Sequence, residues 1–226
     1  MITHLRSTKP VLAFALAFAC GAAGLVTPSA TTLAADASPA VAGVPAAPRV
    51  GELRVAMRTL WEDHITYTRN YIISALADLP DKDAVAARLL ANQDAIGAAI
   101  KPYYGEAAGD KLAGLLRDHI LIATKVVDAA KTGDGDALST RQAEWSANGK
   151  DIAAFLSGAN PNWSRAELEA ALQKHLDLTT GEVVARLNKD WEADIHSYDL
   201  GHQHMLMFAD TLTTGIAKQF PSKVGK

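Results

Sequence analysis

Cysteine and surplus basic charge are both nearly absent from this 226-residue chain. The only cysteine is Cys20, and 22 Lys and Arg residues face 25 Asp and Glu residues, so the net charge is −3. A chain with this balance lacks the basic surface that binds nucleic acid. Segments of alternating apolar and β-branched residues bounded by turns are missing too, so no strands are expected. These absences exclude a nucleic-acid-binding protein and a β-rich domain.

The N-terminus has the pattern of a secretory signal. Arg6 and Lys9 precede the apolar run VLAFALAFACGAAGLV (11–26). A basic start followed by an apolar run is typical of a signal peptide, and this run is short for a membrane-spanning helix. The small residues around Ala34 and Ala37 predict cleavage between these two positions.

We therefore assign residues 1–37 to a signal peptide and expect a secreted or extracytoplasmic protein without a transmembrane helix after cleavage. The alternative is a lipid anchor at Cys20, but the preceding AFA is a poor lipobox because Phe18 is bulky. Cleavage at Ala37 removes the only cysteine, so no disulfide is expected and the fold depends on core packing.

The remaining chain divides into a tether and a helical domain. Residues 38–49 are rich in Pro and Ala and predict a disordered tether. Residues 50–221 have apolar residues at helical spacing throughout and form one domain. The first long helix is expected to begin near residue 50 and to stop before Pro80.

Three more long helices follow the segment 80–104, for which short helices near 83–91 and 94–100 are expected. The second long helix, around 112–127, ends in the TGDG turn, and the third covers 138–155. Two Ser/Thr-x-x-Glu capping boxes predict a short helix from Ser164 and a fourth long helix from Thr179 to about Gln219. The pattern predicts an all-α, antiparallel four-helix bundle with short connecting helices.

Each long helix carries one polar residue within its apolar stripe: His64, His119, Asn148 and Asp194. His119 and Asn148 lie at similar distances from the TGDG turn, so an antiparallel hairpin places them at one height. His64 matches that height within one turn. We therefore predict a polar layer in the middle of the bundle, to which Asp194 also belongs.

Two imidazoles and a carboxylate are suitable ligands for a transition metal with an open position for water. We interpret His64, His119 and Asp194 as ligands of a divalent ion (Zn, Fe or Cu), supported by Asn148, Arg69 and Glu62. A ferritin-like di-iron site is not expected, because Glu62 and His64 are two residues apart and cannot share a helix face.

Two alternatives stay open. The polar layer can instead be a hydrogen-bonded network that fixes helix register in a structural or partner-binding envelope protein. A pairing of Arg69 with Asp194 favours this alternative. An enzyme of unknown reaction ranks third, because no nucleophile with its base and no Gly-rich phosphate loop is found.

A weaker metal candidate lies in HSYDLGHQHMLM (196–207). Histidine and methionine in close order suggest copper outside the cytoplasm, and the candidate ligands are His196, His202, His204 and Met205. One helix cannot gather all four, since His202 and Met205 point into the apolar stripe and His204 points away.

Four stretches carry a resemblance to other proteins: LWEDHITYTRNYIISALADLPD (60–81), LLRDHILIATKVVDAAKTGD (115–134), NPNWS (160–164) and GIAKQFPSK (215–223). Over most of residues 53–223 the chain resembles a group of small bacterial four-helix-bundle proteins. That group has no established activity, although some members carry an automatic glycosyltransferase label. The resemblance implies a helical fold and no catalytic residues, because no residue pattern here supports that label.

Overall fold

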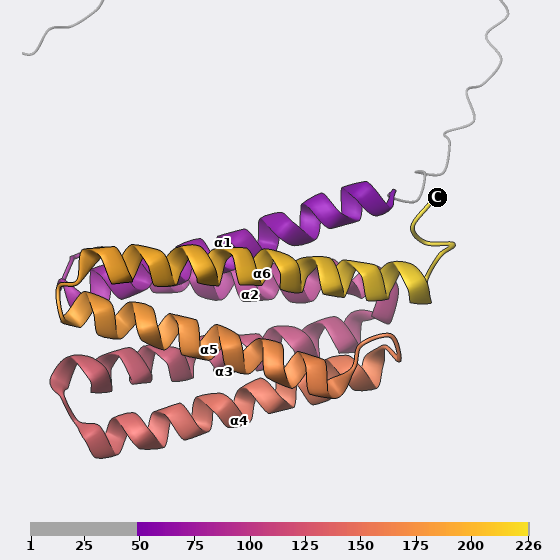
Figure 1. The fold of residues 1–226 in the computed structure, drawn as a ribbon. Helices are drawn as coiled ribbons and strands as arrows, with labels where there is room; N and C mark the ends of the chain where they lie inside the picture. The colour runs from indigo at the N-terminus through magenta and orange to yellow at the C-terminus, as the bar shows by residue number, and fades with distance from the viewer. Residues whose placement is uncertain (1–48, 226) are drawn as a thin grey trace, which may run out of the picture. The chain divides into compact units, whose positions relative to one another are not determined.

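A computed structural model describes residues 49–225, and these residues form helices joined by short turns (Figure 1). The six helices are α1 (Val50–Leu76), α2 (Lys82–Tyr104), α3 (Glu106–Thr132), α4 (Gly135–Ala159), α5 (Arg165–Leu187) and α6 (Trp191–Gln219). The all-α class predicted from the sequence is confirmed for this part of the chain.

Local sequence explains where the helices end. Gly105 and Gly133 adopt positive φ angles of 87° and 72° at the α2–α3 and α3–α4 turns, which glycine tolerates without a steric cost. The Asp134 side chain accepts a hydrogen bond from the Ala137 N–H and so caps α4. Ser164 caps α5 in the same way, through the Glu167 N–H.

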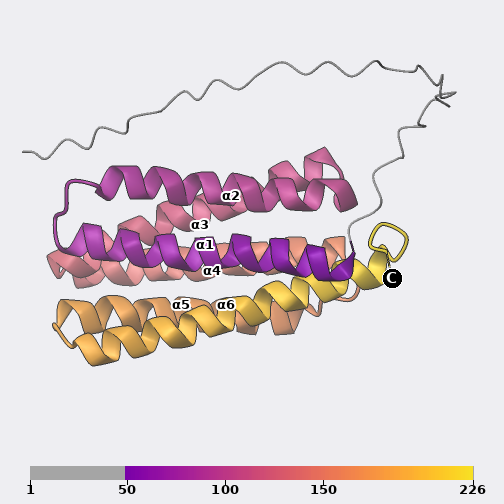
Figure 2. The ribbon, with the colours of Figure 1, turned by 90° about the horizontal axis from the view of Figure 1, so that it is seen from above.

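The helices are arranged as a closed ring in which each packs against its neighbours in sequence and α6 returns to α1. Figure 2 shows α1 lying between α2 and α6. Because every connection is short, successive helices are antiparallel, and α1, α3 and α5 run in one direction. These three helices also contact one another across the interior. A side chain pointing inward from each of them can therefore meet the other two.

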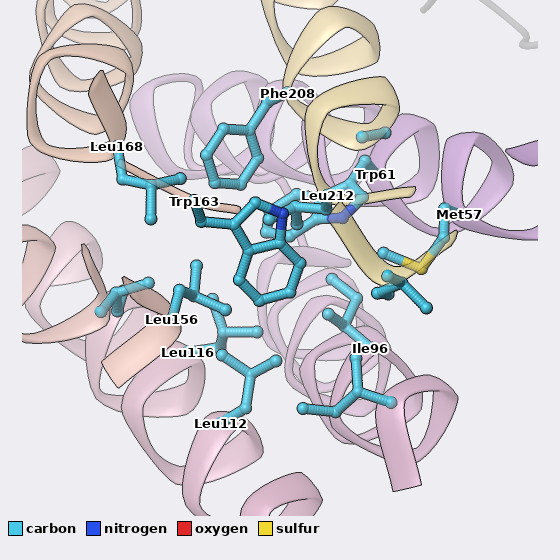
Figure 3. Packing of buried hydrophobic residues seen from close by; sticks show 14 of the residues in the cluster. Met57, Trp61, Ile96, Leu112, Leu116, Leu156, Trp163, Leu168, Phe208 and Leu212 are labelled. Carbon is cyan, nitrogen blue, oxygen red and sulfur yellow. The ribbon is translucent and has the colours of Figure 1, made fainter. Parts of the chain in front are cut away.

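One end of the interior is filled by large apolar side chains, including Trp61, Leu116, Leu168 and Phe208 (Figure 3). Trp163, from the α4–α5 turn, is inserted among them and donates its indole N–H to the Thr211 carbonyl. A Cβ atom at Gly215 would lie 1.9 Å from Trp163 Nε1. Glycine at this position is therefore what allows the indole to enter the core.

The number and bounds of the helices differ from the prediction, because residues 49–225 contain six long helices rather than four. Segment 82–104 is one continuous helix, whereas two short helices near 83–91 and 94–100 were expected. Asn92 and Gln93 are buried there, and their amide groups donate to the carbonyls of Leu60 and Leu89. The bond from Asn92 to α1 thus satisfies a residue whose type usually favours caps and turns, while the Gln93 amide group is satisfied within α2.

The predicted start of a helix at Thr179 is also wrong. Thr179 lies inside α5, where its hydroxyl donates to the His175 carbonyl instead of capping a helix. The actual break comes at 188–190. Lys189 has φ of 60° and Asp190 caps α6 through the Ala193 N–H. This turn contains no Gly or Pro, the residues that mark a break most strongly, and it was therefore not predicted.

The predicted signal peptide, the lipid-anchor alternative at Cys20 and all of the tether except Arg49 lie outside the described residues. Arg49 precedes α1 and pairs with Gly225 in an isolated parallel bridge. Within 49–225, none of the helices combines the length and apolar character needed to cross a bilayer.

Candidate functional site

Three histidines lie at one height in the interior of the ring. His64, His119 and His175 precede the last residues of α1, α3 and α5 by 12, 13 and 12 residues. Since these helices run in the same direction and end at the same end of the ring, equal spacing places the three imidazoles in one layer. We call these three residues the histidine layer.

The three rings lie close together and are shielded from solvent. The centroid of the His64 ring is 6.4 Å from that of His119 and 5.5 Å from that of His175, and the last two are 5.9 Å apart. Their exposed fractions are only 1–2%. At least one complete helix lies between any two of these histidines in the sequence. Only the tertiary fold therefore brings the three side chains together.

Two of the histidines are oriented by amide side chains from the intervening helices. His64 Nδ1 lies 3.2 Å from Gln93 Oε1 on α2, and His119 Nδ1 lies 2.8 Å from Asn148 Oδ1 on α4. The amide NH₂ groups donate to backbone carbonyls, that of Gln93 to Leu89 and that of Asn148 to Leu115. The amide oxygens must therefore accept from Nδ1–H, which leaves a lone pair on Nε2 of each ring.

His175 has no such support. Its Nδ1 atom is buried and has no hydrogen-bond partner among the described residues. The indole nitrogen of Trp145, whose ring centroid lies 5.2 Å from that of His119, is likewise buried without a partner. Buried polar atoms without partners are uncommon and costly, so they indicate a missing water, ion or ligand.

A cavity adjoins the histidine layer. All three histidines and Trp145 line it, and it leaves about 30 Å³ for the centres of water-sized spheres. That space holds about one or two water molecules. None of its lining residues is Asp, Glu, Lys or Arg. Two lining threonines, Thr68 and Thr179, donate hydrogen bonds from their hydroxyl groups to the carbonyls of His64 and His175, one turn earlier.

Burial keeps the three imidazoles neutral. It lowers the pKa of His64 to about 3 and that of His119 to about 4, and it lowers the pKa of His175 well below the ordinary value. Protonated neighbouring histidines would repel one another, and this repulsion lowers the pKa of His64 and His175 further. At neutral pH the layer presents lone pairs and no positive charge.

Asp194 does not belong to the histidine layer. It forms a buried ion cluster with Arg69 on α1 and with Glu182 and Arg186 on α5. Arg69 binds it with two nitrogens, at 2.9 and 3.1 Å, and Arg186 Nη1 lies 2.9 Å from its Oδ2. Arg69 follows His64 by five residues, so the ion cluster lies roughly 7 Å further along the helix axis.

Both oxygens of Asp194 are occupied by guanidinium groups, and this leaves little capacity to ligate a metal. Glu182 completes the cluster with a 2.7 Å contact to Arg69. Burial raises the pKa of Glu182 to about 7, although Arg69 opposes that shift. Glu62, predicted to support the polar layer, is exposed and pairs with His202 at 3.3 Å.

The four weaker metal candidates are not gathered at one point. His196 is exposed and His202 pairs with Glu62, whereas His204 Nε2 lies 2.8 Å from the Ala171 carbonyl oxygen. Met205 is buried in the apolar core. The helix directs them to different surroundings, as its periodicity requires.

The structure thus brings together His64, His119 and Asn148 and adds two partners that sequence reasoning missed, His175 and Gln93. His175 could have been found from its spacing, because it precedes the end of α5 by 12 residues, as His64 precedes the end of α1. The assumed helix start at Thr179 concealed it. Gln93 was hidden in a segment interpreted as a loop.

The layer's chemistry is that of a nitrogen-donor site without an acidic group. As the rings stand, no three His, Cys, Asp or Glu side chains within residues 49–225 surround one point at ligand distance. No family model, no curated protein and no solved structure matches the chain. The functional argument therefore depends on the site itself.

Proposed function

We propose that this protein is a helical-bundle binding protein that holds a transition-metal ion in the histidine layer. His64 and His119 keep the role inferred from the sequence, and His175 replaces Asp194 as the third ligand. The proposal includes a location outside the cytoplasm, for which the signal-like N-terminus is the support.

One observation carries the proposal: three buried, neutral imidazoles from three helices face one cavity, and amide oxygens orient two of them. Metal-binding histidines commonly donate the second ring N–H to such an acceptor, which fixes the tautomer and aims the other nitrogen at the ion. Gln93 and Asn148 do this for His64 and His119. The free Nδ1 of His175 is the unsatisfied group that an ion would explain.

The separations of the rings are compatible with ligation after a small movement. With metal–nitrogen bonds of about 2.0 Å, three imidazole centroids around one ion lie about 5.1–5.5 Å apart, depending on the coordination geometry. The observed separations are 5.5, 5.9 and 6.4 Å, so the longest exceeds these values by about 0.9–1.3 Å. Rotation of the side chains can supply that difference.

The second candidate is a structural or partner-binding protein in which the polar groups serve only the fold. The pairing of Asp194 with Arg69 and Arg186 favours it, because this carboxylate has structural partners. In that case one or two buried water molecules would occupy the cavity and bridge His175 and Trp145.

Metal analysis separates the two candidates. Protein made without a histidine tag is incubated with Zn²⁺, Fe²⁺, Cu²⁺ or Cu⁺, desalted and analysed by mass spectrometry for bound metal. We expect one ion per chain for at least one of these metals and a rise in melting temperature with ion concentration, because the ion binds only the folded state.

Three variants locate the bound ion. His119→Gln should lower occupancy at least tenfold. Asp194→Asn should retain occupancy, because its carboxylate serves the ion cluster, and His196→Gln is the matched control at an exposed histidine. If no ion binds the wild-type protein or raises its melting temperature, metal binding is wrong and the structural candidate stands.

A further inference from the structure

The charge environment of the histidine layer selects among metal ions. Three neutral imidazoles contribute no negative charge, and no Asp or Glu lines the cavity. The carboxylates of the ion cluster are neutralised by Arg69 and Arg186. A bound ion would keep its whole charge.

A buried ion without a counter-charge is costly, and the cost rises with the square of the charge. A divalent ion therefore costs about four times as much to transfer into this cavity as a monovalent ion of similar size. The cavity, with space for about one or two water molecules, also leaves no room for a full hydration shell. Both features disfavour Zn²⁺ and Fe²⁺ at this position.

Resting on the proposed function, we propose that the histidine layer is a site for monovalent copper, with His64, His119 and His175 as three nitrogen ligands around Cu⁺. Imidazole is a good ligand for copper, and a monovalent ion places the smallest charge among three neutral donors.

The test compares two affinities of the wild-type protein. Under anaerobic reducing conditions, Cu⁺ is titrated in competition with bicinchoninate, and Zn²⁺ is titrated in competition with a zinc indicator dye. We expect one Cu⁺ per chain, bound at least tenfold more tightly than Zn²⁺. X-ray absorption of the copper form should show three nitrogen neighbours.

His119→Gln should weaken Cu⁺ binding at least tenfold, whereas the control His196→Gln, at an exposed position among the weaker copper candidates, should leave it unchanged. A carboxylate placed in the cavity tests the role of charge. Thr179→Asp should raise the ratio of Zn²⁺ to Cu⁺ affinity at least tenfold over the neutral Thr179→Asn.

The outcomes distinguish this inference from the proposed function. If Zn²⁺ binds the histidine layer as tightly as Cu⁺, the metal site stands and the preference for monovalent copper is wrong. If Cu⁺ binds but His119→Gln leaves its affinity unchanged, the copper lies elsewhere and the inference is wrong. If neither ion binds, both proposals fail.

Discussion

The histidine layer and the ion cluster are both buried and polar, yet they solve the problem of burial in opposite ways. The ion cluster provides a guanidinium nitrogen for each carboxylate, with Arg69 contacting both Asp194 and Glu182. The histidine layer gives up its charge and is left with unpaired nitrogens, including His175 Nδ1. Saturated groups hold a fold together, whereas unsaturated ones have capacity left for a ligand.

This comparison explains why Asp194 was a poor choice of metal ligand. A buried carboxylate needs partners in the absence of metal, or the chain cannot afford to bury it. Burying a neutral imidazole costs much less free energy than burying a carboxylate, so a metal-free histidine is tolerated in the folded protein with a lone pair facing a cavity. Four predictions test this contrast. In each case the stability is measured in the presence of a chelator.

The largest expected effect is acid destabilisation through the histidine layer. In the folded chain the pKa is about 3 for His64 and about 4 for His119, below the ordinary 6.5. The folded chain therefore binds fewer protons than the unfolded chain below pH 6.5, so stability is full above that pH and is lost as pH falls. Three such groups lower the free energy of unfolding by up to about 4 kcal/mol per pH unit.

Urea unfolding between pH 7 and 5 measures this slope. His119→Gln removes one of the three groups and should reduce the slope by about a third. His196→Gln, at an exposed position, should not change it. An unchanged slope in His119→Gln would show that this buried histidine does not govern acid stability.

The second effect is loss of the ion cluster. Asp194→Ala leaves Arg69 and Arg186 without their shared carboxylate and should lower the free energy of unfolding by about 3–5 kcal/mol. Asp199→Ala, at an exposed position of the same helix, should change it by less than about 0.5 kcal/mol. Chemical denaturation measures both, and similar values for the two variants would contradict the structural role of Asp194.

The third effect is removal of an amide that orients the histidine layer. Asn148→Ala leaves the buried His119 Nδ1–H without its acceptor and should cost about 1–3 kcal/mol. Ser146→Ala on the same helix breaks only an exposed hydrogen bond to Gln173 and should cost less than about 0.5 kcal/mol. If the two costs are equal, the Asn148–His119 bond adds nothing to stability.

The smallest effect comes from the one titrating member of the ion cluster. The pKa of Glu182 is about 7 in the folded chain against an ordinary 4.5, so its stabilising contribution is full below pH 4.5 and is lost as pH rises to 7. This single group contributes at most about 1.4 kcal/mol per pH unit, opposite in sign to the histidines.

Glu182→Gln tests this point because the amide does not titrate. Relative to the wild type, the variant should gain stability steadily from pH 5 to pH 7. Glu192→Gln, at an exposed position near the start of α6, should show no such trend. A constant difference between wild type and Glu182→Gln across the window would mean that Glu182 does not titrate there.

The helical class, the cap at Ser164 and the inward position of His64, His119 and Asn148 could be predicted from the amino-acid sequence alone. These features depend on residues within about one or two helical turns, so periodicity and capping chemistry reveal them. The continuity of α2 through Asn92 and Gln93, the continuity of α5 through Thr179 and the break at Lys189 were not predictable in this way. The Asn92 amide donates to the Leu60 carbonyl on α1, whereas the Thr179 hydroxyl donates to the His175 carbonyl within its own helix, so both side chains are satisfied without a loop or a cap.

The choice of polar partners was also left to the tertiary structure. Arg69 contacts residues more than a hundred positions away, and His175 meets His64 only because α1, α3 and α5 run in one direction around a closed ring. Sequence spacing can place a residue on a face of a helix, but it does not say which other faces lie opposite. That depends on how six helices share one interior, which is settled by packing the whole domain.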